Sequence, residues 1–295
     1  MVRRADVAAL LVASGMVVAA VWRAGVTDVY ALPVTDPIAE ASVAGSDDSS
    51  TSVDTTPAVL SNAAVPPGYT RIAKPAIPNG PRRVGIQVGH WQTESVPDEL
   101  RRLEQQTGTS WNGITEWSVN LDIAERTAKL LQAHGYVVDI LATTIPAGYL
   151  ADAFVALHAD GDGVGTASGY KLAHGARRTP FEDQLLRDLS AEYGAATGLD
   201  IDPNITRGML GYYAFSWQRY RSATAPHTPS VILEMGFLSN DDDRDLLVDQ
   251  PDIVAQGIAA GIERFLNEVP AAKLFGEDLV LPPSRPLFPL PSARP

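Results

Sequence analysis

The sequence predicts an α/β domain in which helices flank a mostly parallel, twisted sheet. Between about residues 81 and 269, short apolar segments alternate with longer segments of helical periodicity. Segment 230–237, SVILEMGF, is a nearly continuous apolar run, as expected of a strand that is covered on both faces. No internal repeat is visible, which argues against tandem modules. Alternating strands and helices are typical of one domain built on a parallel sheet.

The strands are expected where apolar and β-branched residues cluster between turn residues. Five such segments occur, at 83–89, 136–141, 153–159, 169–174 and 230–237.

Three helices are expected between or after these strands, at 115–135, 180–198 and 251–269. In the first, Thr115 is a suitable N-cap and Gly135 a suitable C-terminal stop. The spacing of its apolar residues predicts one buried face, formed by Trp117, Leu121, Ala124, Ala128 and Leu131. The second helix aligns Phe181, Leu185, Leu189 and Tyr193 in the same way.

Composition restricts the classes of function. The chain has 295 residues and a net charge of −12, which argues against a nucleic-acid partner because such proteins need a basic face. It contains no cysteine, so a disulfide framework and a thiolate metal site are both excluded. Any metal ion must therefore be bound by histidine and carboxylate side chains.

The N-terminus has the pattern of a targeting segment. Arg3 and Arg4 precede residues 7–22, which carry no charge, and Arg23 follows them. Sixteen helical residues span about 24 Å, which suits a signal peptide or a short signal anchor better than a full membrane span. The paired arginines at the N-terminus favour targeting over a buried core helix, and no small-x-small cleavage site follows directly, which favours an uncleaved anchor over a cleaved peptide. We expect residues 1–32 to direct export.

Two further segments have compositions that do not favour a packed core. Residues 33–80 include the polar, acidic stretch 45–57, GSDDSSTSVDTTP, and are expected to form a disordered tether. Residues 270–295 end in the proline-rich 281–295 and are expected to form an extended tail, either inert or bound by a partner that recognises proline-rich segments.

Chemically competent side chains end three of the predicted strands: His90, His158 and Glu234. Glu116 opens the first helix. Ligands bind at the carboxyl ends of parallel strands, so these residues can converge on one edge of the sheet. Two histidines and a carboxylate would leave zinc one position for water, and a second carboxylate could take the proton from that water. Each residue also has an ordinary explanation, such as a strand-end hydrogen bond, a core histidine or a helix-dipole anion.

The order of the motifs resembles the zinc-dependent N-acetylmuramoyl-L-alanine amidases of the amidase-3 family. The matching stretches are GH, TEWSVNLDIAERTAKLLQAHGYVV, ADAFVALHADG, RGM and SVILEMGFLSNDDD, and they cover about residues 82–267. ILEMGFLSN is the most specific of them. The resemblance implies that His90, Glu116 and His158 bind Zn²⁺ and that Glu234 is the general base.

The resemblance further implies a single catalytic domain over residues 81–269. It would hydrolyse the amide between N-acetylmuramic acid and L-alanine in peptidoglycan, at an extracytoplasmic location in a bacterium, anchored to the membrane or secreted. Arg207 matches an Arg-Gly pair of the family and is expected to bind substrate, unless it forms a surface ion pair. Another zinc amidohydrolase or carboxypeptidase, or a non-catalytic wall-binding domain, would be compatible with the same residues.

The chain departs from the family around the first ligand. The family reads Asp-Pro-Gly-His-Gly-Gly, whereas this chain reads QVGHWQ. Trp91 and Gln92 therefore replace glycines, and we expect them to reshape the mouth of the cleft. Asp160 stands where asparagine is usual. The histidines without a matching role, expected to be structural or on the surface, are His134, His174 and His227.

Overall fold

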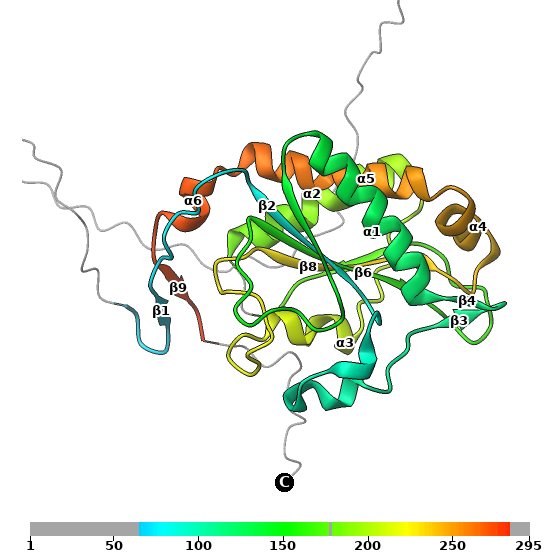
Figure 1. Cartoon of the computed structure of the whole chain (residues 1–295), viewed down its shortest axis with the longest axis horizontal. Coiled ribbons are helices and arrows are strands. Elements are labelled where there is room, and N and C mark those ends of the chain that lie inside the picture. Colours follow the sequence, from blue (N-terminus) through cyan, green and yellow to red (C-terminus); the bar gives the residue numbers. More distant parts are fainter. Residues whose placement is uncertain (1–64, 177–178, 284–295) are drawn as a thin grey trace, which may run out of the picture. The chain divides into compact units, whose positions relative to one another are not determined.

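A computed structural model describes residues 65–176 and 179–283 (Figure 1). The predicted signal segment 1–32, most of the predicted tether and the last residues of the predicted tail lie outside these ranges. Within them, no helix has the length and apolar character that a membrane span requires.

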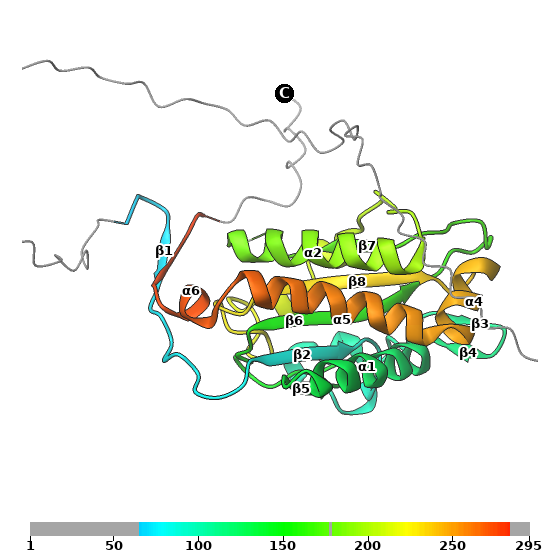
Figure 2. The ribbon, with the colours of Figure 1, turned by 90° about the horizontal axis from the view of Figure 1, so that it is seen from above.

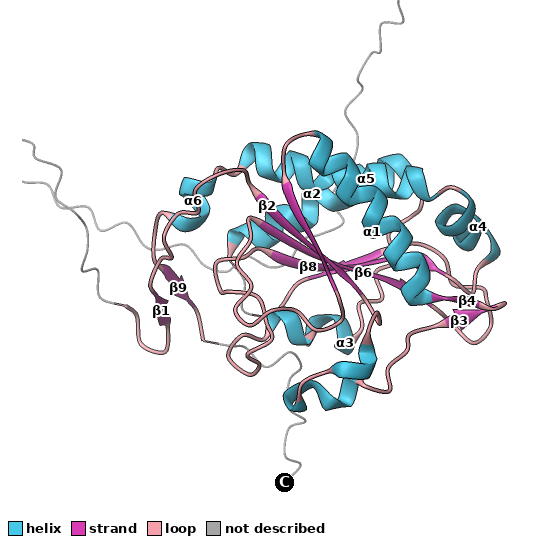
Figure 3. Ribbon diagram, viewed as in Figure 1, coloured by secondary structure: helices cyan, strands magenta, loops and turns pink. Residues whose placement is uncertain are grey.

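The central sheet has five strands in the order β5-β2-β6-β8-β7 (Figure 3). They are β2 (Arg83–Val88), β5 (Val137–Leu141), β6 (Ala153–Asp160), β7 (Lys171–Ala173) and β8 (Ser230–Phe237). β2 pairs in parallel with β5 and β6, and β6 pairs in parallel with β8, whereas the short edge strand β7 is antiparallel to β8. The predicted mostly parallel sheet is thus confirmed.

Three long helices cover one face of this sheet (Figure 2). They are α1 (Glu116–Ala133), α2 (Pro180–Thr197) and α5 (Pro251–Glu268), close to the predicted ranges. Helices α2 and α5 approach closely because α5 has glycine at the contact: a Cβ on Gly261 would lie 2.6 Å from the Cα of Leu189. The layer seals the main core, in which Leu185, Leu189 and Tyr193 of α2 are fully buried.

The predicted buried face of α1 is partly wrong. Trp117 is 37% exposed, whereas Ile123, Ala124 and Leu131 are fully buried. The buried stripe also contains polar residues, among them Glu116 and Asn120, which an apolar pattern does not detect. Relative to the prediction, the helix is therefore rotated about its axis. Its first turn points the carboxylate of Glu116 into the molecule and leaves the ring of Trp117 exposed.

The other face of the sheet is covered by loops and short helices. These are the 3-10 helices Thr93–Ser95, Asp98–Leu103 and Tyr213–Phe215, and α3 (Arg207–Leu210). Side chains of a strand alternate between faces, so Val155 and Leu157 of β6 pack beneath the long helices while Phe154 and Ala156 join a second core on this side.

The remaining elements lie at the margins of the sheet. They are the hairpin β3 (Ser110–Trp111) and β4 (Ile114–Thr115), the helices α4 (Asp241–Asp249) and α6 (Ala271–Phe275), and the ribbon of β1 (Thr70–Ile72) and β9 (Leu279–Leu281). β1 and β9 pair in antiparallel fashion, and the side chain of Asp278 accepts a hydrogen bond from the Lys74 backbone at 3.0 Å. The predictions of a disordered tether for 33–80 and of an extended tail for 270–295 are therefore wrong at β1 and β9, because each strand supplies the pairing partner that the other lacks.

Candidate metal centre

The sheet brings the predicted residues to one edge and one face. β2, β6 and β8 are parallel and end at the same edge, beside which α1 begins. His158 and Glu234 are register partners on β6 and β8. They share the face of Phe154 and Ile232, opposite the long helices, because side chains two residues apart point the same way. His90 follows β2 after one residue, Gly89.

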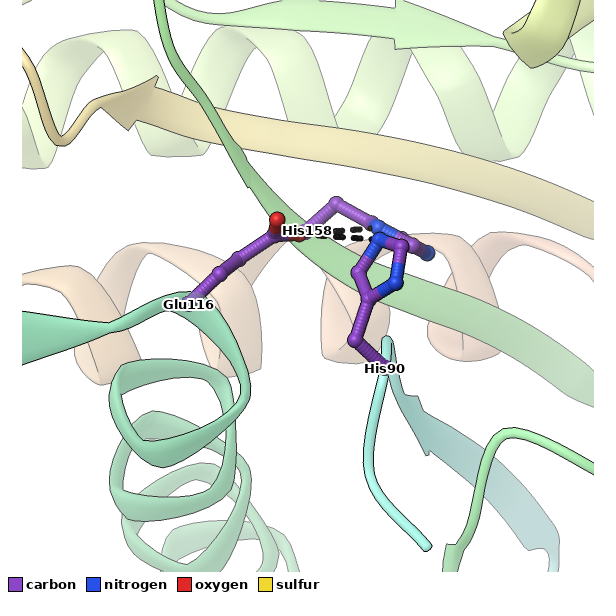
Figure 4. Close-up of side chains that lie close together, drawn as sticks. All are labelled: His90, Glu116 and His158. Atoms are coloured by element: carbon purple, nitrogen blue, oxygen red, sulfur yellow. Dashed lines mark hydrogen bonds and ion pairs between the residues drawn. The ribbon is translucent and has the colours of Figure 1, made fainter. Parts of the chain in front are cut away.

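The side chains of His90, Glu116 and His158 come together at this edge of the sheet (Figure 4). Oε1 of Glu116 lies 3.0 Å from Nδ1 of His158 and 3.5 Å from Nε2 of His90, and the candidate ligand atoms all lie within 4.8 Å of one another. Ligands on a tetrahedral ion with bonds near 2.1 Å stand about 3.4 Å apart, so the observed spacing suits such an ion. Two nitrogens and one carboxylate oxygen form a donor set that can hold a divalent metal.

The backbone at His90 is held in an unusual conformation. Its φ of 63° is in the left-handed region, which is uncommon for a residue with a side chain. The turn directs the ring back over the strand edge, where Nδ1 donates to the carbonyl of Gln106 at 2.6 Å. A neutral ring with its proton on Nδ1 presents the lone pair of Nε2 to Glu116. The strained backbone at His90 therefore directs Nε2, the candidate ligand atom, towards Glu116.

Glu116 is fixed by backbone donors on both oxygens. Oε2 accepts from the N–H of Thr109 at 2.8 Å, and Oε1 accepts from the N–H of Ala159 at 3.2 Å, where the β6 ladder is irregular. Burial acts to raise the pKa of Glu116, but the hydrogen bond and charge of His158, together with His90, outweigh it and lower the pKa to about 2. Glu116 is therefore an anion at neutral pH, as a metal ligand must be.

Glu234 differs from Glu116 in its surroundings. It is partly buried and lines the same cleft as the two histidines. Burial raises its pKa to about 7, and the charges of Glu116 and Asp160 add to this effect against His158 and Lys171. Lys171 is occupied elsewhere, with Nζ at 2.5 Å from Asp160 and also bound to Asp202. A carboxyl that titrates near pH 7 is suited to accept and return a proton.

The cleft that contains these side chains has a volume of about 320 Å³. Arg207, the predicted substrate-binding residue, lies on its wall at the start of α3. Arg102, which sequence reasoning missed, lines it from the 3-10 helix 98–103, with its guanidinium 5.7 Å from the ring centre of Tyr220. No sequence motif marks Arg102, since only folding brings that helix to the cleft.

Two glycines, also missed, make room for the ligands. A Cβ on Gly89 would lie 2.6 Å from both ring nitrogens of His158, and a Cβ on Gly108 would lie 2.6 Å from Oε2 of Glu116. Gly89 belongs to the Gly-His pair in the sequence, so its position beside a ligand could have been noticed. Nothing in the sequence around Gly108 distinguishes it from an ordinary turn.

The prediction that Trp91 and Gln92 shape the mouth of the cleft is wrong. Trp91 packs against the main core, and neither residue is among those that line the cleft. The other three histidines lie outside the cluster. His134 pairs with Glu263, His174 contacts Asp183 at 3.1 Å, and His227 is buried with its pKa lowered by burial.

Comparisons with known proteins agree with the family resemblance of the sequence motifs. Residues 84–264 match the profile of the family described as N-acetylmuramoyl-L-alanine amidase (Amidase_3). No curated protein sequence matches the chain.

Solved structures of amidases are similar to this chain. The N-acetylmuramyl-L-alanine amidase Ami1 from Mycobacterium smegmatis is similar with a TM-score of 0.50 and 20% identity, over 64% of this chain and 98% of that one. The catalytic domain of CwlV, an amidase from Bacillus (Paenibacillus) polymyxa var. colistinus, has a TM-score of 0.42 and 22% identity, over 63% and 98%. The CwlD amidase from Clostridioides difficile, solved with the GerS lipoprotein, has a TM-score of 0.47 and 17% identity, over 63% of this chain and 99% of that one. The family match covers more than half of the chain, which therefore belongs to the N-acetylmuramoyl-L-alanine amidases, hydrolases of peptidoglycan.

Proposed function

We propose that this amidase depends on zinc, that His90, Glu116 and His158 bind the ion, and that Glu234 is the general base. The observation that carries the proposal is the convergence of two imidazole nitrogens and an ionised, buried carboxylate beside a second carboxylate of raised pKa. Nitrogen and carboxylate ligands without cysteine are typical of hydrolytic zinc sites with an open position.

In this scheme a bound zinc ion would supply Lewis-acid chemistry, polarising the scissile carbonyl and making water acidic enough to lose a proton near neutral pH. Glu234 accepts that proton as the oxygen attacks the carbonyl carbon, and it returns the proton to the nitrogen of L-alanine as the C–N bond breaks. The products are a lactyl carboxylate on the sugar and a free alanine amine. Glu116 keeps its negative charge throughout because its pKa is low.

Arg207 and Arg102 are proposed to bind carboxylates of the stem peptide that follows L-alanine. Both line the cleft and place positive charge there, in a chain whose net charge is −12. Arginine binds carboxylates through two parallel hydrogen bonds, which gives direction as well as attraction.

Export is proposed from residues 1–32, which carry paired arginines before an uncharged stretch. Peptidoglycan lies outside the cytoplasmic membrane, so an exported enzyme, either anchored or secreted, reaches its substrate. Fractionation of cells that express the chain with and without residues 1–32 tests this point. Retention of both forms in the cytoplasm would contradict it.

The catalytic proposal is tested on the purified chain by metal analysis and by digestion of muropeptides. We expect close to one zinc per chain, loss of activity with a chelator, recovery with zinc, and a new amino terminus at L-alanine. His90→Ala and His158→Ala should each lose most of the zinc, whereas His174→Ala, a histidine outside the cluster, should keep it. A new amino terminus at a different amide would support another amidohydrolase, and full zinc retention in both cluster variants would refute the ligand assignment.

A further inference from the structure

We propose that Gln87 and Tyr212 are positioning residues that place the ring proton of His158 on Nε2, so that Nδ1 presents its lone pair to the metal. The proposal rests on the metal-dependent function proposed above. Tyr212 lies outside the motifs that mark the ligands and the general base, and Gln87 is not among the residues to which those motifs assign a role. Gln87 stands where the family motif Asp-Pro-Gly-His has aspartate, and Tyr212 follows α3.

The chain of hydrogen bonds starts at the backbone carbonyl of Thr143, which can only accept. It accepts from Nε2 of Gln87 at 2.7 Å and from the hydroxyl of Tyr213. The hydroxyl proton of Tyr213 is used in that bond, so its oxygen acts as an acceptor towards Nε2 of Gln87, also at 2.7 Å. Both contacts require the NH₂ end of the Gln87 amide, which fixes the orientation of the amide. Its oxygen must then face Tyr212.

The direction of each following bond is determined in turn. The hydroxyl of Tyr212 donates to Oε1 of Gln87 at 2.8 Å, which leaves its oxygen as the acceptor for Nε2 of His158 at 3.2 Å. In the neutral ring that a metal ligand must have, the single proton therefore lies on Nε2. Nδ1, which lies 3.0 Å from Oε1 of Glu116, is then the nitrogen that can take up a metal ion or a second proton.

Without a cation, this arrangement would bring acceptors together. The lone pairs of Nδ1 of His158 and Nε2 of His90 both point at the Glu116 carboxylate. Acceptors at such distances repel each other unless a proton or a metal ion lies between them. Nδ1 of His158 therefore takes up either a second proton or a metal ion, and Nε2 keeps its proton in both states.

This series of hydrogen bonds is held in place because the residues at which it starts are buried. Gln87 is fully buried, Tyr213 is 1% exposed, and both are anchored by the central sheet or the second core. An aspartate or glutamate at position 87 could not donate to the carbonyl of Thr143, so this proton arrangement requires the amide. Partners of metal-binding histidines fix the ring tautomer and orientation, and losing one typically weakens metal binding by about 10- to 100-fold.

Two substitutions test the proposal in the full chain, with zinc affinity measured by competition with a chromogenic chelator. Tyr212→Phe removes the acceptor for Nε2 and should weaken zinc binding roughly 10- to 100-fold. Gln87→Leu leaves Tyr212 in place but frees its hydroxyl to donate to Nε2, which shifts the ring proton to Nδ1 and should also weaken binding. The matched control is Tyr170→Phe, which removes a buried hydroxyl bonded to the Ser190 carbonyl at 2.9 Å, away from the cleft, and should keep the wild-type affinity.

A wild-type measurement decides the matter even if a variant fails to fold. In the zinc-loaded chain with ¹⁵N-labelled histidine, His158, assigned by the loss of its signals in His158→Ala, should show a proton on Nε2 and the metal on Nδ1. Coordination through Nε2, or equal zinc affinity in Tyr212→Phe and wild type, would overturn the proposal while leaving the zinc-dependent activity intact. A wild-type chain that binds no zinc would overturn both proposals.

Discussion

Replacing Gly89 with alanine tests whether the ring of His158 lies where a metal ligand must lie. The φ angle of Gly89 is outside the left-handed region, so alanine meets no backbone penalty there, and its N–H can still donate to Leu157 at 3.0 Å. The only new feature is a methyl group whose carbon would lie 2.6 Å from both ring nitrogens. The effect is therefore steric and confined to one ligand.

The magnitude follows from the distance. The nearest ring atom, Cε1, would lie 2.4 Å from the new methyl carbon, and ordinary contact begins near 3.4 Å, so the ring must move by about 1.0 Å. His158 is only 6% exposed and is bonded through both nitrogens, to Glu116 and to Tyr212, so it cannot turn aside without breaking one of these contacts. Overpacking of this kind costs about 1–3 kcal/mol of stability. The shift also exceeds the roughly 0.2 Å tolerance of metal–ligand distances, so zinc affinity should fall about 10- to 100-fold.

The assay compares zinc affinity by chelator competition with the thermal unfolding of the metal-free protein. Gly163→Ala is the matched control, because a Cβ at that position meets nothing within 4 Å and its φ angle is ordinary. We expect the control to behave as wild type in both measurements. If Gly89→Ala kept wild-type zinc affinity, the ring position in the structure would not be the metal-binding one, and the reasoning would be refuted.

Further predictions concern other carboxylates and the cleft wall. Glu234→Gln should keep its zinc but lose about 10²–10⁴-fold in turnover. Glu116→Gln should lose zinc as well as turnover. Near-native turnover in Glu234→Gln would exclude Glu234 as the general base. Burial raises the pKa of Glu182 to about 7, above its usual value of 4.5, so the folded state holds this proton more tightly than the unfolded state. The stability of the wild type should therefore fall as the pH rises from about 4.5 to 7 and Glu182→Gln should remove that part of the slope, as urea unfolding at several pH values can check. Arg102→Ala should raise KM for muropeptides that carry carboxylates more than for amidated ones, with little change in kcat; equal effects on both would argue against a contact with carboxylates.

Much of the fold could be read from local patterns. The near-continuous apolar run of β8 and the alternation of strands and helices predicted a mostly parallel sheet, and the three long helices begin and end close to the expected residues. Such features depend on neighbours within a few residues, which a sequence displays directly. The orientation of α1 was not predictable in the same way, because its buried stripe includes Glu116, whose burial is compensated by groups distant in the chain.

The sequence by itself determined the family, through its motifs, and named the residues that converge: His90, Glu116, His158 and Glu234. Only the tertiary structure decided how those side chains are oriented. Gly108 leaves room for Glu116, and the carbonyl of Thr143 sets, through a series of hydrogen bonds, which nitrogen of His158 carries the proton. The physical reason is that a ligand type depends on one residue, whereas its tautomer, charge and aim depend on partners that meet it only when strands far apart in the chain are paired.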